Sequence, residues 1–129
     1  MVRLKDLQIP SVESIHFSLL NDHHIDFNSL GFSVMTGSVG NISSNSDLFS
    51  VVASAMEFPD YFGNNWDALN DCLRDMEWMP AAGYLLVLND ASKGWSHSPY
   101  VLGQFVSTWL GACEYWIKHN VPFHLLFVM

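Results

Sequence analysis

The sequence predicts an α/β fold in which a three-stranded parallel sheet packs against helices. The continuous apolar run YLLVL at Tyr84–Leu88 is typical of a strand covered on both faces, and the apolar stretch FHLLFVM at Phe123–Met129 indicates another strand. A third strand is indicated by GFSVMTG at Gly31–Gly37, which is rich in β-forming residues and bounded by glycines. Helical patterns separate these strands, and strands joined by helices pair in parallel.

The first thirty residues carry weaker signals. Residues 1–13 are expected to be irregular, because Pro10 interrupts any helix. The alternation of apolar and polar residues in Ser14–Leu20 favours a strand over a short helix. The polar stretch Asn21–Asn28 is expected to be a loop.

A helix is predicted to begin at Asp47, with Ser46 as its N-cap, and to end near Glu57 or Phe58 because Pro59 follows. Its apolar residues repeat at helical spacing: Leu48, Val51, Val52, Ala55 and Met56.

An aromatic turn at Asp60–Asn65 precedes the next helix. Gly63 is expected to adopt a positive φ, and Asn64 or Asn65 to cap the helix. Its buried side is predicted to comprise Trp66, Leu69, Cys72, Leu73 and Met76.

The polar, turn-rich stretch Asn89–Pro99 is expected to be a loop. Tyr100–His119 is predicted to be a long helix that Asn120–Pro122 terminates. Its core stripe is predicted to be Leu102, Phe105, Val106, Trp109, Leu110, Cys113 and Ile117.

The composition indicates one acidic domain spanning residues 1–129. Half of the residues are hydrophobic, which is enough to bury a core. The net charge of −8 arises from only 18 charged residues, so the surface repels nucleic acid and anionic lipid and attracts cationic proteins or metal ions. Direct nucleic-acid binding is therefore disfavoured.

Two cysteines, Cys72 and Cys113, are too few for a disulfide framework, and both lie in patterns typical of buried helix positions. The N-terminus lacks the apolar run of a signal peptide, and no stretch approaches about 20 apolar residues. We therefore expect a cytoplasmic protein without a membrane span.

The stretch FPDYFGNNWDALNDCL at Phe58–Leu73 is the most informative part of the chain. Asp67 and Asp71 lie four residues apart and so share one helical face, where like charges cost about 0.2–0.5 kcal/mol per pair. Arg74 is the only basic residue between positions 57 and 77. The acids of this region are Glu57, Asp60, Asp67, Asp71, Asp75 and Glu77. Such a cluster is expected to serve a basic partner.

The same residues give weaker support for an enzyme than for a protein that binds a basic partner. The carboxylates of Asp67, Asp71 and Asp75 could hold a divalent ion for metal-dependent hydrolysis, but three acids on one exposed helix do not enclose an ion. Cys72 has no nearby histidine in the sequence to activate it. The stretch Lys93–Ser98 holds serine and histidine without a recognisable catalytic spacing.

The histidines do not indicate a metal site. His23 and His24 are adjacent but lack further ligands, which is typical of a loop. The other histidines are scattered, with no partner at ligand spacing: His16, His97, His119 and His124.

From Gly31 to Met129 the chain resembles the barstar family of ribonuclease inhibitors. The strongest match is FPDYFGNNWDALNDCL, which is similar to that family's aromatic–aromatic–Gly–x–Asn–x–Asp–Ala–Leu–x–Asp–Cys–Leu signature. VMTG, YLLVL and the C-terminal apolar run resemble its three strands. Residues 1–30 are then an N-terminal extension of a core at residues 31–129, and Trp78–Gly83 is a longer connection than in small members.

The resemblance implies a protein without catalysis or cofactor that blocks the active site of a basic ribonuclease or nuclease-type toxin in a one-to-one complex. It implies that Tyr61, Gly63, Asn65, Asp67 and Asp71 contact the partner. Asp71 would take the place of a substrate phosphate, and Tyr61 would cover the catalytic base. Members of the superfamily also resemble immunity proteins for diverse bacterial toxins.

The expected contact surface extends from Tyr61 to Asp75 and so includes Asn64, Asn70 and Asp75 as well. Tyr61 is expected to be exposed and Phe62 to be buried. This chain has Asn70 where the family often has a bulky aromatic residue, and it places Glu114 and Tyr115 where the last helix supplies an acid. These departures leave the target open, and an acidic interaction module without inhibitory activity is the other alternative.

Overall fold

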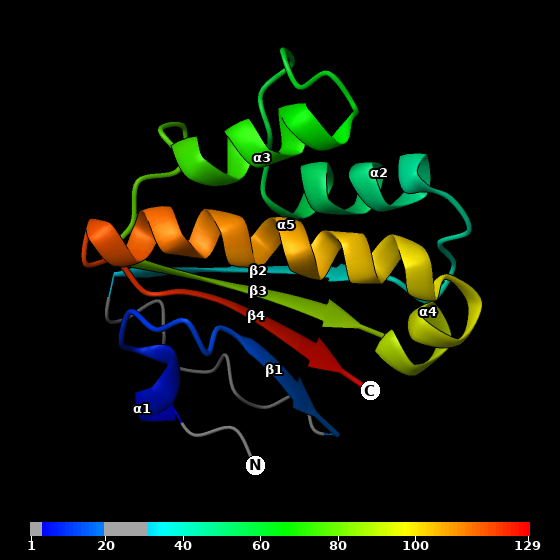
Figure 1. The fold of residues 1–129 in the computed structure, drawn as a ribbon, viewed down its shortest axis with the longest axis horizontal. Coiled ribbons are helices and arrows are strands. Elements are labelled where there is room, and N and C mark those ends of the chain that lie inside the picture. Colours follow the sequence, from blue (N-terminus) through cyan, green and yellow to red (C-terminus); the bar gives the residue numbers. More distant parts are fainter. Residues whose placement is uncertain (1–3, 20–30) are drawn as a thin grey trace.

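The computed structural model describes residues 4–19 and 31–129, and in these ranges four parallel strands form one sheet (Figure 1). The strands are β1 (Ile15–Ser18), β2 (Phe32–Ser38), β3 (Gly83–Asn89) and β4 (Phe123–Val128). Their order across the sheet is β1-β4-β3-β2. The prediction of a parallel α/β fold is confirmed, but the predicted number of three strands is wrong.

The additional strand is β1, in the N-terminal extension. It pairs in parallel with β4, with Ile15 opposite Leu125 and Ser18 opposite Val128. Backbone bonds of 2.8 Å from the Leu125 amide to the Ser14 carbonyl and from the Met129 amide to the Ser18 carbonyl extend the pairing. The alternation in Ser14–Leu20 had favoured a strand, and β1 satisfies backbone groups along an edge of β4 that would otherwise be open.

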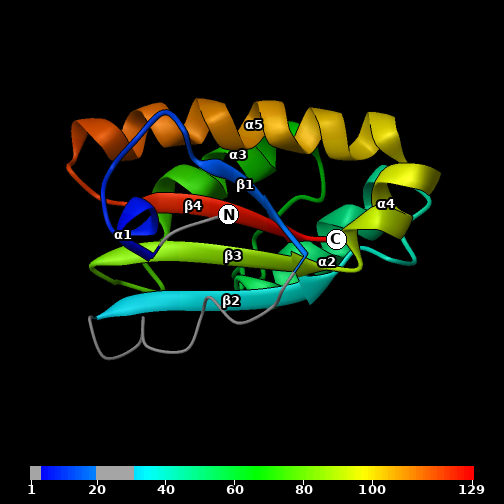
Figure 2. The ribbon, with the colours of Figure 1, turned by 90° about the horizontal axis from the view of Figure 1, so that it is seen from below.

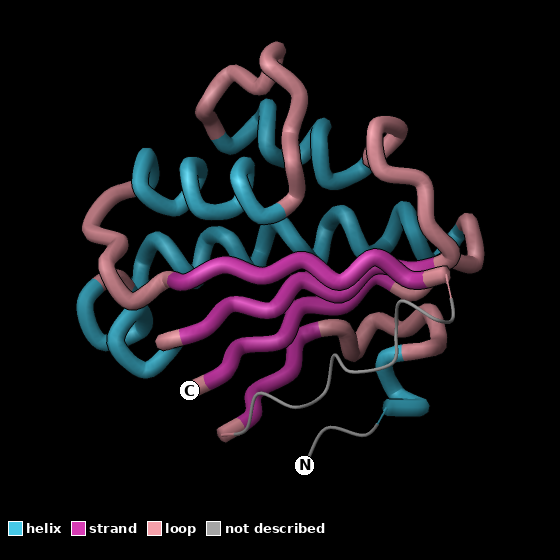
Figure 3. The backbone as a smooth tube through the Cα atoms, turned by 180° about the vertical axis from the view of Figure 1, so that it is seen from behind, coloured by secondary structure: helices cyan, strands magenta, loops and turns pink. Residues whose placement is uncertain are grey.

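The two faces of the sheet are covered by different numbers of helices. The helices are α1 (Leu4–Leu7), α2 (Asn45–Ala55), α3 (Trp66–Asp75), α4 (Ala91–His97) and α5 (Pro99–Lys118). α2 contacts β2, α4 and α5 contact β4, and α3 packs on α5 as the outermost helix. α1 lies on the opposite side of the sheet, as Figures 1 and 3 show from the front and from behind. No helix in the described ranges is long and apolar enough to cross a bilayer.

The core follows the alternation of the two central strands. One set of side chains joins the helices in the main cluster: Tyr84, Leu86 and Leu88 of β3 and Phe123, Leu125 and Phe127 of β4. The other set packs with Leu7 of α1 in a small second cluster: Leu85, Val87, Leu126 and Val128. Both strands are therefore covered on both faces, as the continuous apolar run of β3 predicted for that strand.

Several local predictions were wrong. Ser44, not Ser46, caps α2 by accepting a 3.1 Å bond from the Asp47 amide. The polar stretch Asn89–Pro99 contains α4, because Trp95 packs against Phe17 and Phe127 and supplies the apolar contact that its composition conceals.

Two further expectations also failed. Residues 1–13 include the short α1, which ends before Pro10. Leu110 belongs to the predicted core stripe of α5 but is 39% exposed, whereas Trp116 is buried.

Candidate protein-binding surface

α3 is fixed at both ends and along its inner side. The Asn65 side chain caps its N-terminus by accepting a 2.8 Å bond from the Ala68 amide, which resolves the choice between Asn64 and Asn65. Leu69 and Leu73 are fully buried beneath it. The indole N–H of Trp116 donates a 2.7 Å bond to the Leu73 carbonyl and so ties α3 to α5. The outer side of α3 is therefore held in one orientation.

The turn before α3 differs from the prediction in one respect. The residue with positive φ is Asn64, at 54°, and not Gly63. Asparagine tolerates this conformation. A Cβ on Gly63 would lie 3.3 Å from Nδ2 of Asn65, so the glycine serves close packing of the turn against its cap.

The two aromatic residues of the turn separate as expected. Phe62 is buried and packs edge-to-face against Phe49 and Phe58. Tyr61 is 69% exposed. One ring therefore anchors the turn while the other faces outward.

The aspartates of α3 form an exposed acidic stripe, which we define as Asp67, Asp71 and Asp75. Asp67 and Asp71 are exposed and Asp75 is half-buried. In the described ranges, no lysine or arginine forms an ion pair with them. Arg74 instead donates a 3.3 Å bond to the Gly111 carbonyl of α5. The negative charge of the stripe is therefore directed to solvent.

A hollow of about 140 Å³ lies between the turn and α3. Its lining is Tyr61, Phe62, Ala68, Asp71, Cys72 and Asp75. The Tyr61 hydroxyl donates a 3.2 Å bond to Oδ2 of Asp75, while Oδ1 of Asp75 accepts a 3.3 Å bond from the Glu77 amide. Desolvation, followed by this bond to Asp75, raises the pKa of Tyr61 above its ordinary value.

Cys72 lines the same hollow, but its thiol is unreactive. Burial first, and then the charges of Asp75 and Asp71, raise the pKa of its thiol. The thiol therefore stays protonated at neutral pH and is a poor nucleophile. Both cysteines are buried and unpaired, as the sequence predicted.

The remaining candidate residues lie around this centre. Gly63, Asn64 and Asn65 are exposed on the turn, and Asn70 is half-buried on α3. Tyr115 packs against Trp116 and His119, and Glu114 lines a separate pocket with Val12 and Leu110. The structure thus gathers Tyr61, Asp71 and Asp75 around the hollow, with the other predicted contacts beside it.

The distribution of possible metal ligands is also informative. Among residues 4–19 and 31–129, no three histidine, cysteine, aspartate or glutamate side chains are grouped so as to hold a metal ion. His23 and His24 lie outside the described residues.

The sequence did not predict that two histidines form a pair. Nε2 of His16 and Nδ1 of His124 are 2.9 Å apart, although both were expected to lack a partner. A separation of 108 residues gives no signal in the sequence, because only the pairing of β1 with β4 brings the rings together.

Comparison with known proteins identifies the family. A family model described as Barstar (barnase inhibitor) matches residues 32–128, which is most of the chain. The chain belongs to the barstar family. No curated protein matches it. Barstars inhibit barnase-type ribonucleases and are not enzymes, so family membership favours an inhibitory role. The family match runs from β2 to β4 and excludes α1 and β1, of which β1 forms one edge of the sheet and α1 packs on its face.

Proposed function

We propose that this protein inhibits a basic ribonuclease or nuclease-type toxin by covering its active site with α3 and the turn before it. The observation that carries the proposal is the acidic stripe. Two of its three members are exposed, it forms no ion pair with lysine or arginine in the described ranges, and it stands on a helix that is capped and anchored to α5. Such a surface is suited to an external cation.

The chemistry of a ribonuclease complements this surface. A nuclease cleft is basic because it binds phosphodiesters, and carboxylates accept charge-assisted hydrogen bonds from the same arginine and lysine side chains. The stripe is therefore a phosphate mimic that the enzyme does not cleave. The net charge of −8 also favours rapid encounter with a basic partner.

Asp71 has the most suitable position for the central anion. It is the middle member of the stripe and borders the hollow beside Tyr61. A side chain of the partner that enters the hollow would meet the carboxylates of Asp71 and Asp75 together with apolar side chains of the lining. We assign Asp67 and Asn70 to flanking contacts on α3.

Tyr61 and Asp75 act together in this proposal. The bond from the tyrosine hydroxyl to Asp75 holds an exposed ring that would otherwise rotate freely. A ring held before binding loses less entropy on association. We assign Tyr61 to cover the catalytic base of the nuclease, and Gly63, Asn64 and Asn65 to the close approach of the turn.

The complex is proposed to contain one copy of each protein, without a cofactor, and to protect a cell against a nuclease encountered in the cytoplasm. An immunity protein for a nuclease toxin would act in this way. The inhibitor needs neither a bound metal nor catalysis of its own.

Titration of barnase, and then of a panel of other basic ribonucleases, tests the proposal. We expect one-to-one inhibition with an association rate that falls as salt is added. Asp71→Asn is expected to weaken binding at least about tenfold, because a hydrogen bond to a charged group contributes about 1.5–3 kcal/mol. Glu13→Gln removes the same charge from the N-terminal segment, outside α3 and its turn, and is the control.

Two results would contradict the assignment. If Asp71→Asn binds a nuclease as tightly as the wild-type protein does, the assignment of Asp71 as the central anion is wrong. If no basic ribonuclease is inhibited while the folded protein captures a different class of basic protein, the inhibitory function itself is wrong.

A further inference from the structure

The N-terminal segment is joined to the sheet through a pair of histidines. His124 is completely buried and is the one polar residue of β4, whose sequence is otherwise apolar. Its Nε2 lies 2.8 Å from the Ile9 carbonyl oxygen, and its Nδ1 lies 2.9 Å from Nε2 of His16 on β1. Both nitrogens of a buried imidazole are therefore engaged by the segment before β2.

The partners of His124 define its protonation state. A carbonyl oxygen only accepts, so Nε2 of His124 carries the proton and donates to Ile9. The Nδ1 atom of the neutral ring must then accept, and Nε2 of His16 donates to it. One added proton can be accommodated by a change of tautomer, but when both rings are protonated an N–H group of each ring faces the other. The chain of hydrogen bonds is therefore broken once both rings are charged.

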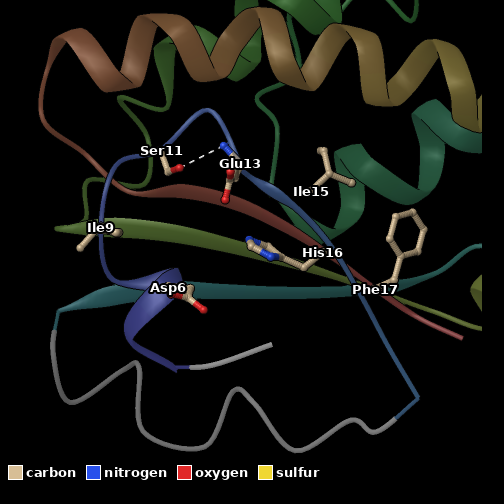
Figure 4. Close-up of a pocket in the computed structure, with 7 residues that line it drawn as sticks. All are labelled: Asp6, Ile9, Ser11, Glu13, Ile15, His16 and Phe17. Atoms are coloured by element: carbon tan, nitrogen blue, oxygen red, sulfur yellow. Dashed lines mark hydrogen bonds between the residues drawn. The ribbon is translucent and has the colours of Figure 1, made fainter. Parts of the chain in front are cut away.

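The surroundings of the pair contain few charges. Asp6 of α1 and Glu13, which precedes β1, line the same cavity of about 560 Å³ as His16 (Figure 4). From α5, the buried thiol of Cys113 donates a 3.0 Å bond to the Ser11 carbonyl and adds no charge of its own. Asp6 favours protonation of both rings, but burial has the larger effect on each.

The segment has other attachments as well, since Phe17 of β1 packs against Phe127 and Trp95. Leu7 of α1 is buried in the small second cluster with residues of β3 and β4. β1 is only four residues long and forms an edge of the sheet. A segment held by one short strand and one short helix opens at a lower free energy than the central sheet. A change in the charge of the histidine pair can therefore act on this segment before it acts on the whole fold.

We propose that the His16–His124 pair is a pH-sensitive latch that holds residues 5–19 against β4 at neutral pH and releases them in acid. Release separates β1 from β4, uncovers the β4 edge and removes Leu7 from the underside of the sheet. The latch is independent of the proposed inhibition, because α1 and α3 lie on opposite sides of the sheet, as Figure 2 shows from below.

The direction of the pH dependence follows from the shifted pKa values. Burial, reinforced by the charge on His124, lowers the pKa of His16 from 6.5 to about 4, and burial also lowers the pKa of His124. The neutral rings therefore stabilise the closed segment fully above about pH 6.5, and this contribution is lost as the pH falls toward 4. Within that window the titration of His16 raises the open fraction by up to about tenfold per pH unit, and the lowered pKa of His124 acts in the same direction.

Hydrogen exchange of the full-length protein between about pH 7 and pH 4, corrected for the intrinsic rate, tests the latch. The informative amides are Leu125 and Met129, which donate to carbonyls of the segment, and Leu69 in α3 is the internal reference. We expect protection of Leu125 and Met129 to fall steeply with acid while that of Leu69 persists. Equal loss at all three amides, or no loss at any of them, would overturn the proposal.

Two substitutions make the test specific. His124→Gln retains one donor for Ile9 and one acceptor for His16 but does not titrate, so the pH dependence of opening is expected to fall to the contribution of His16 alone. His16→Gln retains the donor to His124 and should reduce the pH dependence of protection by up to about tenfold per pH unit. If His124→Gln does not fold, the pH dependence of protection in His16→Gln tests the latch alone. A wild-type pH dependence in either folded variant would refute the latch.

Discussion

Neutralising the middle residue of the acidic stripe should stabilise the free protein. Asp71 lies four residues from Asp67 and four from Asp75 on an exposed helical face. Each like-charge pair at this spacing costs about 0.2–0.5 kcal/mol, and Asp71→Asn removes two of them. Asparagine and aspartate have similar helix propensities, so the substitution changes little else. The free energy of unfolding should rise by about 0.4–1 kcal/mol at low salt.

Asp67→Asn is the matched comparison. It removes one repulsive pair, but it also removes a negative charge from the first turn of α3, where the helix dipole favours it by about 0.3–1 kcal/mol. The two effects oppose each other, so the net change should be close to zero. The pair of variants separates repulsion within the stripe from a general effect of lowering the net charge.

Urea unfolding, followed by tryptophan fluorescence at roughly 20 mM and roughly 1 M salt, measures both variants. The gain from Asp71→Asn should largely disappear at the higher salt, because screening shortens the range of the repulsion. A loss of stability at low salt, or a gain that salt does not change, would refute the reasoning. The stripe would then be a stabilising part of the fold and not an array maintained for a partner.

Two other comparisons test local packing. Gly103→Ala should raise the free energy of unfolding by about 0.5–1 kcal/mol, because an added Cβ meets nothing within 4 Å and alanine favours a helix. Gly94→Ala, also in a helix, should lower the free energy of unfolding by about 1–3 kcal/mol, because its Cβ would lie 2.7 Å from the Val39 carbonyl oxygen. Chemical denaturation of both variants checks the pair, and equal effects would contradict it. Ser44→Ala should lower the free energy of unfolding by about 1 kcal/mol through loss of the α2 cap, whereas Ser46→Ala should change it by less than about 0.5 kcal/mol. Thermal melts measure both variants, and the reverse order would show that the cap is misassigned.

Much of the candidate surface was predictable from local pattern. Helical spacing places Asp67 and Asp71 on one face whatever packs beneath α3, and the apolar residues of the same helix indicate its inner side. Tyr61 and Phe62 were expected to separate, and they do so because only the Phe62 ring packs against Phe49 and Phe58. The positive φ at Asn64 was assigned to Gly63, since asparagine and glycine both tolerate that conformation.

The amino-acid sequence alone determined the α/β class, the strands β2, β3 and β4, the main helices and the acidic stripe, because each depends on residues close together in the chain. Tertiary structure decided that β1 joins β4, that His16 meets His124 and that the Tyr61 hydroxyl reaches Asp75. These contacts join residues 14 to 110 positions apart, and they exist only once the order of the strands and the packing of α3 are set. Periodicity reports which side of an element is buried, but it carries no information about which element lies against it.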